Sequence, residues 1–345
     1  MNDLAKIGNA DSFERVELEA LKNEGCSTDN FDHHASLYKG IDVRLMQLSD
    51  GSFNGRLGLG LSDKIAIHLS ICTRSVEQHM IADANKFVFC VSPSETHSHA
   101  VFGNASLNSS VFILPPRGEA VAVVPEDVPL LTMTLDRDLL LQCDGLLPTV
   151  GAWFQAIGPE GETINSLTLS SRLRTDAFAK LRSAHGQLDK QHLRTMDQLF
   201  VSNIANSFSL EWLKEKRFLS PKRSAALDRF LKARCLVWQN PHNLAGNGQH
   251  AIFQLGSKRS VEQAFAERVD MGPLSYARLV RLHNARRKLS DPKFARESIG
   301  NIAAQEGFWE WSRFTSYYGK HFGELPSQTR ENAAPSDLSP QAMAG

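Results

Sequence analysis

Arg259 and Gln263 carry side chains whose hydrogen-bonding patterns suit the edges of nucleic-acid bases. In the major groove of DNA, arginine pairs with guanine and glutamine with adenine, each through two hydrogen bonds. The two residues are four apart, so in a helix they share one face. Val261 and Phe265 are also four apart and point to a different, inward side. The segment 258–268 is therefore predicted to be an amphipathic helix that offers one face to bases.

This helix is expected to be the second of a helix-turn-helix. A short helix at about 248–255 comes first, with Ala251, Ile252 and Leu255 as its apolar face. Gly256 suits the tight turn between the two helices, and Ser257 is a suitable N-cap for the second.

Residues 298–330 repeat the pattern. Ser298 is expected to cap a helix over 298–305, and Gly307 suits the turn that follows. A second helix over 309–322 places apolar side chains near one face and ends before Gly323. The apolar side chains are Phe314, Tyr318 and Phe322. The base-reading candidates of this helix are Trp311, Ser312 and Ser316, and one of the two tryptophans, Trp309 and Trp311, is expected in the core.

A helix from Pro273 to Leu289 is predicted between the two units, because proline favours the first position of a helix. Seventeen residues at ~1.5 Å each give a spacer of roughly 25 Å. With the offset of the flanking helices, such a spacer suits two recognition helices about 34 Å apart, one turn of B-DNA.

The charge of the chain is unevenly distributed. Residues 221–330 contain 18 Lys and Arg against 9 Asp and Glu, whereas residues 1–220 contain 20 against 27. A basic C-terminal third indicates a module that binds a polyanion. The candidate phosphate contacts in it are Ser257, Lys258, Arg268, Arg313 and Lys320.

These C-terminal residues resemble the DNA-binding domain of the AraC/XylS transcription regulators. The spacer helix has that family's spacing, and so does the second helix-turn-helix. The matching positions of the spacer are Pro273, Tyr276, Arg281, Leu282, Ala285, Arg286 and Leu289. Those of the second unit are Ser298, Ile299, Ile302, Ala303, Gly307, Phe308, Ser312, Phe314, Phe322, Gly323, Pro326, Ser327 and Arg330.

Two departures from the family pattern bear on the reading of bases. Trp309 and Trp311 stand where polar residues are common, and Ser316 stands where a basic residue is common. The second recognition helix is therefore expected to read thymine methyls or the backbone. Arg259 and Gln263 remain the stronger base-reading candidates.

The resemblance implies an α+β protein. It would have an N-terminal cupin-like β-barrel that senses a small molecule, a helical segment that dimerises, and an all-α C-terminal domain with two helix-turn-helix units. It also implies double-stranded DNA and RNA polymerase as partners. The expected domains are an effector-sensing domain (1–165), a helical dimerisation and linker segment (166–220), a DNA-binding domain (221–330) and a disordered tail (331–345).

The N-terminal residues agree with this layout but carry no specific motif. Residues 36–140 contain short apolar stretches separated by turn residues, which indicates a small antiparallel barrel or sandwich. The clearest stretches are Ile65–Ile71, Lys86–Val91, Ser110–Leu114 and Leu130–Leu135. From about Ser171 the apolar spacing becomes helical, and Gly186 is expected to separate two helices, the second ending near Leu213.

Several polar residues of the N-terminal part have two interpretations. His97 and His99 have the spacing of metal ligands, with His33, His34, His68 and His79 as further candidates, but turn or surface histidines are the default and no metal site is assigned. Arg44, Arg56 and Arg117 suit either an anionic effector or ordinary surface charge. The apolar stripe over 190–213 fits either a dimer helix or a helix packed on its own domain.

No catalytic motif or phosphate-binding glycine loop is found, so neither enzyme activity nor a cofactor is expected. Five scattered cysteines and the absence of an 18-residue apolar run indicate a cytoplasmic protein without a membrane segment. The predicted function is a sequence-specific transcription regulator, an activator gated by a small molecule. The alternative is a regulator controlled by a partner protein or by its abundance, and a cupin-type enzyme is the remaining class.

Overall fold

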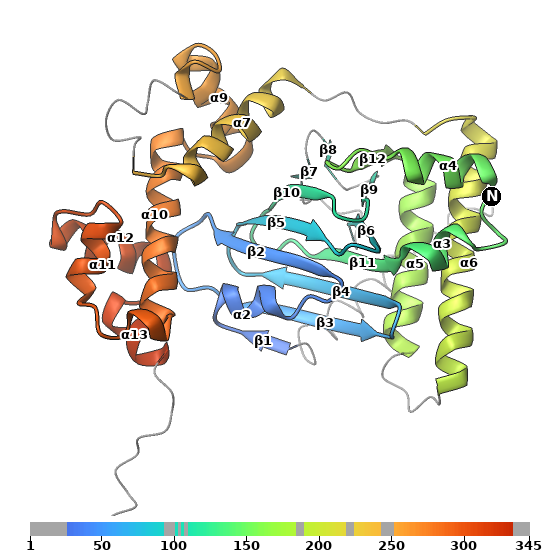
Figure 1. The fold of residues 1–345 in the computed structure, drawn as a ribbon, viewed down its shortest axis with the longest axis horizontal. Coiled ribbons are helices and arrows are strands. Elements are labelled where there is room, and N and C mark those ends of the chain that lie inside the picture. The colour runs from blue at the N-terminus through green and yellow to red at the C-terminus, as the bar shows by residue number, and fades with distance from the viewer. Residues whose placement is uncertain are drawn as a thin grey trace, which may run out of the picture. The chain divides into compact units, whose positions relative to one another are not determined.

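The structure is a computed structural model, and it describes residues 26–92, 101–102, 105–106, 110–183, 190–218, 224–242 and 252–333. The chain divides into two compact units. The N-terminal unit comprises Met1–Gln47 and Phe53–Arg223, and the C-terminal unit comprises Leu48–Ser52 and Ser224–Gly345. Figure 1 shows the strands and the long helices α5 and α6 of the first, and the helices of the second.

The strands of the N-terminal unit form two antiparallel sheets. One has the order β1-β3-β4-β11-β6-β9-β12 and the other the order β2-β5-β10-β7-β8. The strands of the first are β1 (Cys26–Thr28), β3 (Gly55–Leu61), β4 (Ile65–Cys72), β11 (Leu130–Asp136), β6 (Lys86–Val91), β9 (Ser110–Leu114) and β12 (Glu162–Asn165). Those of the second are β2 (Ile41–Gln47), β5 (Val76–Ala82), β10 (Glu119–Val124), β7 (Val101–Phe102) and β8 (Ala105–Ser106).

One face of the larger sheet carries the main apolar core. Because successive side chains of a strand point to opposite faces, Ile65, Ile67 and Leu69 of β4 share a face. They pack with Phe87 and Phe89 of β6 in one buried cluster. The described residues of this unit also form the helices α2 (Phe31–Ser36), α3 (Arg137–Leu141), α4 (Pro148–Ala156), α5 (Leu167–Ser183) and α6 (Lys190–Glu215).

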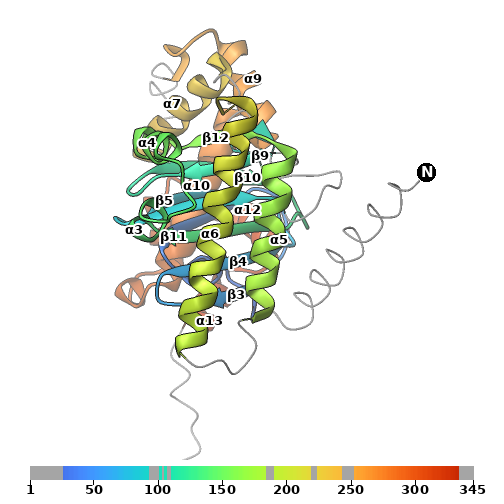
Figure 2. The same ribbon diagram turned by 90° about the vertical axis from the view of Figure 1, so that its right-hand side faces the viewer.

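Helices α5 and α6 run side by side, as Figure 2 shows, and supply residues to this core. Leu173 of α5 and Phe208 of α6 are fully buried in it. A buried ion pair also joins the two helices, with 2.5 Å between Lys180 Nζ and Asp197 Oδ1. The two helices therefore form a layer that is fixed to the sheet.

Several of the alternate residues of the same strands are polar and buried. His68 of β4 pairs in register with Thr132 of β11, which pairs with Cys90 of β6. All three are 0% exposed. This polar row lies on the face opposite the helix-covered core, since it alternates with the core residues along each strand.

His34 and His68 are held in this polar region by fixed hydrogen bonds. His34 Nδ1 lies 3.0 Å from Thr28 Oγ1, and its Nε2 lies 2.9 Å from Ser70 Oγ. His68 Nε2 accepts from the backbone N–H of Lys39 at 2.9 Å, and its ring stacks on Tyr38 with 4.9 Å between centroids. Burial lowers the pKa of each imidazole from 6.5 to about 4, so both are neutral at pH 7.

The predicted strands and helices of the N-terminal part can be compared with the structure. The four predicted strands are β4, β6, β9 and β11, and each agrees with its prediction to within one residue. The helical region begins at Leu167, four residues before Ser171, and α6 ends at Glu215. Sequence patterns missed α4 and β12. Gly186 and the pair His97 and His99 lie outside the described residues.

Among the described residues, no cluster of His, Cys, Asp or Glu could hold a metal ion. Arg44 and Arg117 are exposed, which favours ordinary surface charge. Within the same ranges, none of the helices combines the length and the hydrophobicity that crossing a bilayer requires.

In the C-terminal unit, the regular elements of residues 224–242 and 252–333 are all helical. Its elements are α7 (Ala225–Gln239), α9 (Lys258–Val269), α10 (Pro273–Ser290), the 3-10 turn η3 (Pro292–Phe294), α11 (Ile299–Gln305), α12 (Trp311–Phe322) and α13 (Pro326–Ala333). This arrangement confirms the α+β class, with a β-rich N-terminal region and a helical C-terminal region. Of the helix expected at about 248–255, only Ile252 and Phe253 are described as helical. Much of the tail predicted to be disordered, residues 334–345, lies outside the described ranges.

The buried neutral histidines make the N-terminal unit sensitive to acid. Their pKa is about 4 in the folded protein and near 6.5 in the unfolded chain, so the unfolded state binds more protons between these values. We expect the free energy of unfolding to fall as the pH drops from 6.5 to 4, by about 3 kcal/mol at most for each imidazole. Thermal unfolding of wild type, His34→Gln and the exposed-neighbour control His33→Gln at several pH values measures this. Equal pH slopes for the two variants would contradict it.

Candidate nucleic-acid interface

Helix α10 is the central element of the C-terminal unit. Its N-terminal half packs against α7 and α9, and its C-terminal half against α11 and α13 (Figure 1). Nine of its 18 residues are buried. At ~1.5 Å per residue it spans roughly 27 Å.

Aromatic packing fixes the first helix-turn-helix to α10. The rings of Phe230 (α7), Phe265 (α9) and Tyr276 (α10) meet edge to face, with 5.1 Å and 5.3 Å from Phe265 to its two neighbours. Trp238 Nε1 donates a hydrogen bond of 2.9 Å to the hydroxyl of Tyr276. The buried hydroxyl therefore has a partner, and the three helices share one small core.

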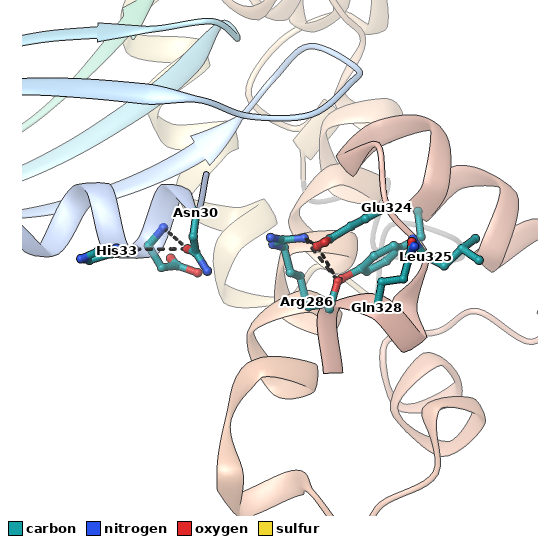
Figure 3. Close-up of polar contacts among 9 residues, drawn as sticks. Asn30, His33, Arg286, Glu324, Leu325 and Gln328 are labelled. Carbon is teal, nitrogen blue, oxygen red and sulfur yellow. Dashed lines mark hydrogen bonds and ion pairs between the residues drawn. The ribbon is translucent and has the colours of Figure 1, made fainter. Parts of the chain in front are cut away.

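A buried polar network fixes the second helix-turn-helix to the other half of α10. Arg286 forms an ion pair with Glu324, as Figure 3 shows, and its guanidinium lies 4.9 Å from the ring of Phe322. Glu324 Oε1 also accepts from the hydroxyl of Thr329 at 2.6 Å. Thr329 in turn lies 2.7 Å from the hydroxyl of Tyr318, whose pKa burial raises to about 12. Helices α10, α12 and α13 are thus joined through hydrogen bonds to a single carboxylate.

The turn before α12 is also held by α10. Gly307 has φ +74°, a conformation that favours glycine, and a Cβ there would lie 3.0 Å from Arg281 Nη1. Arg281 donates to the Gly307 carbonyl at 3.3 Å, and its guanidinium lies 4.9 Å from the ring of Phe308. Lys288 Nζ pairs with Glu306 Oε1 at 2.8 Å just before the turn. The start of α12 is therefore positioned by α10 on two sides.

Helix α9 presents the first candidate face. Ser257 caps it by accepting from Ser260 N at 3.2 Å, as predicted. Val261 and Phe265 are buried, whereas Arg259 and Gln263 are exposed on the opposite side. The sequence therefore placed both base-reading candidates of this helix on one accessible face.

Helix α12 presents the second candidate face. Phe314, Tyr318 and Phe322 are buried, as predicted, and Gly323 ends the helix in a left-handed conformation. Ser312 and Ser316 are both exposed and four residues apart, so they share one stripe.

The expectation for the tryptophans is wrong. Neither is in the core: Trp309 is 84% exposed and Trp311 is 51% exposed. Helix α12 begins only at Trp311, so Trp309 precedes the helix and is not part of its inner face. The ring of Trp311 contacts Phe314 at 5.9 Å between centroids, near the edge of the buried face. Trp311 therefore lies apart from the stripe of Ser312 and Ser316.

The candidate phosphate-binding residues differ in their exposure and in the charged groups beside them. Lys258 and Arg313 are exposed, and each is near a carboxylate of its own helix end, Glu262 at 3.9 Å and Glu310 at 2.9 Å respectively. Lys320 Nζ lies 2.8 Å from Asp50 of the Leu48–Ser52 segment, and this contact raises its pKa.

Arg268 differs from the other cations. It is about half a turn around α9 from Arg259 and Gln263 and is partly buried, and this burial lowers the pKa of its guanidinium. The structure thus keeps Arg268 away from the exposed stripe of α9.

Sequence reasoning missed two carboxylates on the first face. Glu262 and Glu267 are exposed and flank the stripe that contains Arg259 and Gln263. Gln263 Nε2 donates to Glu267 Oε1 at 2.8 Å. The signal was available in the sequence, since Glu267 is four residues after Gln263 and such pairs interact on helices.

Comparison with known proteins places the likeness in this part of the chain. Residues 256–332 match the family described as a helix-turn-helix domain. The chain is 37% identical over 79 residues to the XylDLEGF operon transcriptional activator 1 of Pseudomonas putida, which is 23% of this chain and 24% of that protein. It is also 37% identical over 81 residues to activator 2 of the same operon, where the match covers 24% of this chain and 52% of the relative. The chain thus covers between about a quarter and half of these relatives.

Solved structures give a weaker likeness. The AraC-like transcriptional activator CuxR matches 76% of this chain and 95% of its own, with 14% identity and a TM-score of 0.37. ToxT from Vibrio cholerae matches 85% of this chain and 98% of its own, with 13% identity and a TM-score of 0.28.

Proposed function

Residues 256–332 are a helix-turn-helix domain related to those of AraC/XylS-type activators, and from this premise we propose that the chain is a sequence-specific DNA-binding transcription regulator. The observation that carries the proposal is the pair of exposed faces on α9 and α12, two helices that both contact α10 in a basic unit. Double-stranded DNA is the polyanion that fits two such helices in successive major grooves.

The two faces have different chemistry. Arg259 and Gln263 of α9 are proposed to read guanine and adenine edges, while Ser312 and Ser316 of α12 are proposed to contact bases through hydroxyls. Trp311 is proposed to contact a thymine methyl from the edge of the second face. Phosphate contacts are proposed for Ser257, Lys258, Arg313 and Lys320, with Arg268 as the weakest of the original candidates because it is partly buried.

We further propose that the protein is an activator that contacts RNA polymerase. The named relatives are transcriptional activators, and the likeness to them lies within the domain that would hold the promoter. A regulator of this kind works where the chromosome lies, so a cytoplasmic location is proposed.

A small-molecule effector is proposed for the N-terminal unit. Its support is the buried polar row of His68, Thr132 and Cys90, together with Tyr38, because buried polar side chains are costly and are often kept for recognition. The alternative, a regulator controlled by a partner or by abundance, needs no such row. Thermal-shift measurements on the full chain with a metabolite panel distinguish the two, since a ligand of the folded state stabilises it.

A homodimer is proposed through α6. Leu199, Asn203, Asn206, Leu210 and Leu213 are all exposed and follow a 4-3-4-3 spacing, which is that of a helix-to-helix seam. The three leucines are more than half exposed. Beside the seam, a groove of about 340 Å³ lies between α5 and α6 and is lined by Thr175, Asp176, Asn203 and Leu210 among others. A second copy of the same stripe is self-complementary to it.

Loss of a base contact and loss of a phosphate contact should weaken DNA binding in different ways. Arg259→Ala should weaken binding to the preferred site by about 1–3 kcal/mol and relax one base position. Lys258→Ala should weaken binding to all duplexes similarly and lower the slope of log K against log salt by about one unit. Fluorescence anisotropy with a selected duplex and a scrambled one, at several salt concentrations, measures both. Equal effects of the two variants on both duplexes would contradict the assignment.

The second prediction concerns the dimer. Leu199→Asp and Leu210→Asp place a charge in the seam and should convert a dimer into a monomer at micromolar concentration. Gln198→Asp adds the same charge at an exposed position beside the seam and should leave the dimer intact. Sedimentation velocity on the full chain measures the mass. A monomeric wild type, or a dimer that survives both leucine changes, would rule out this seam.

A further inference from the structure

The exposed face of α9 contains a hydrogen-bonded pair, Gln263 and Glu267, at its centre and edge. Gln263 Nε2 donates to Glu267 Oε1 at 2.8 Å, and both side chains are exposed. A carboxylate only accepts hydrogen bonds, so the amide atom that faces Glu267 must be the nitrogen. Glu267 therefore determines which way the Gln263 amide points.

The fixed amide matches one base. With one N–H bonded to Glu267, Gln263 keeps one N–H to donate and one oxygen to accept. Adenine offers the complement in the major groove, because N7 accepts and the N6 amino group donates, whereas guanine offers two acceptors. We propose that Glu267 is a positioning residue that orients Gln263 to select adenine; this proposal rests on the DNA-binding function proposed above.

The charge of Glu267 is unfavourable at this position in two ways. Glu267 lies in the last turn of α9, where the negative end of the helix dipole disfavours an anion. On a face that approaches phosphates, its charge also repels the ligand. The hydrogen bond to Gln263 is a contact that can offset these two costs, since side chains four residues apart interact on a helix.

Glu262 provides a matched control on the same helix. It is also exposed and flanks the same stripe, but its carboxylate pairs with Lys258, with 3.9 Å between Lys258 Nζ and Glu262 Oε1. Loss of either carboxylate removes one negative charge from the DNA-facing side. Only loss of Glu267 releases the amide of Gln263.

The experiment uses the full chain and a duplex selected by wild type from a randomised library. The base pair that Gln263 reads is identified as the one at which Gln263→Ala loses discrimination. Wild type should prefer adenine over guanine there by roughly 5- to 150-fold, as expected for a bidentate pair. Glu267→Ala should reduce this ratio at least threefold while it tightens binding to a scrambled duplex. Glu262→Ala should tighten binding to the scrambled duplex and leave the ratio unchanged.

A purely electrostatic or structural role of Glu267 would not make Glu267→Ala lose adenine preference while it gains affinity for the scrambled duplex. The proposal is overturned if Glu267→Ala keeps the full adenine preference, or if Glu262→Ala loses as much of it. A wild type that binds selected and scrambled duplexes equally would instead remove the proposed function itself. Glu267→Gln retains an acceptor oxygen without the charge, and it should keep more of the adenine preference than Glu267→Ala.

Discussion

The ion pair of Arg286 with Glu324 is the interaction on which the arrangement of the C-terminal unit depends. Arg286 is 8% exposed, and its guanidinium lies against the ring of Phe322. Glu324 accepts from Arg286 of α10 and Thr329 of α13, and Thr329 in turn contacts the hydroxyl of Tyr318 in α12. Removal of one partner from such a buried pair leaves an uncompensated charge, which typically costs about 3–5 kcal/mol. At the other half of α10, Tyr276 has the same role through ring packing and one hydrogen bond.

Because α10 is held at both halves, the faces of α9 and α12 are fixed with respect to each other while their own side chains differ in chemistry. The α9 face has both hydrogen-bond donors and hydrogen-bond acceptors, with cations and carboxylates side by side. The α12 face has hydroxyls and cations, with Trp309 and Trp311 exposed near its start. Such a division suits one half of a DNA site read by hydrogen bonds and another half read by shape, methyl groups and charge.

Local patterns predicted much of this fold, and tertiary packing accounts for what they missed. The strands Lys86–Val91 and Ser110–Leu114 have the predicted bounds, because turn residues delimit them. Trp309 could not be placed from its hydrophobicity, since its exposure depends on where α12 begins. Arg268 was grouped with the exposed cations because charge alone does not reveal that it lies opposite Arg259. The polar row of His68, Thr132 and Cys90 follows only from strand pairing between residues some forty to sixty positions apart in the sequence. The base and phosphate contacts themselves, and the domain boundaries, stay predictions.

Native-state hydrogen exchange of the C-terminal unit tests most directly whether α10 makes one rigid body of the two helix-turn-helix units. The account predicts that the amides of Phe265, Val280 and Tyr318 exchange through one shared opening with a single free energy. Arg286→Ala should lower that free energy at Phe265 in α9 as much as at Tyr318 in α12. Exchange of Phe265 through an opening that leaves Tyr318 protected, unchanged by Arg286→Ala, would show two independent bodies and contradict it.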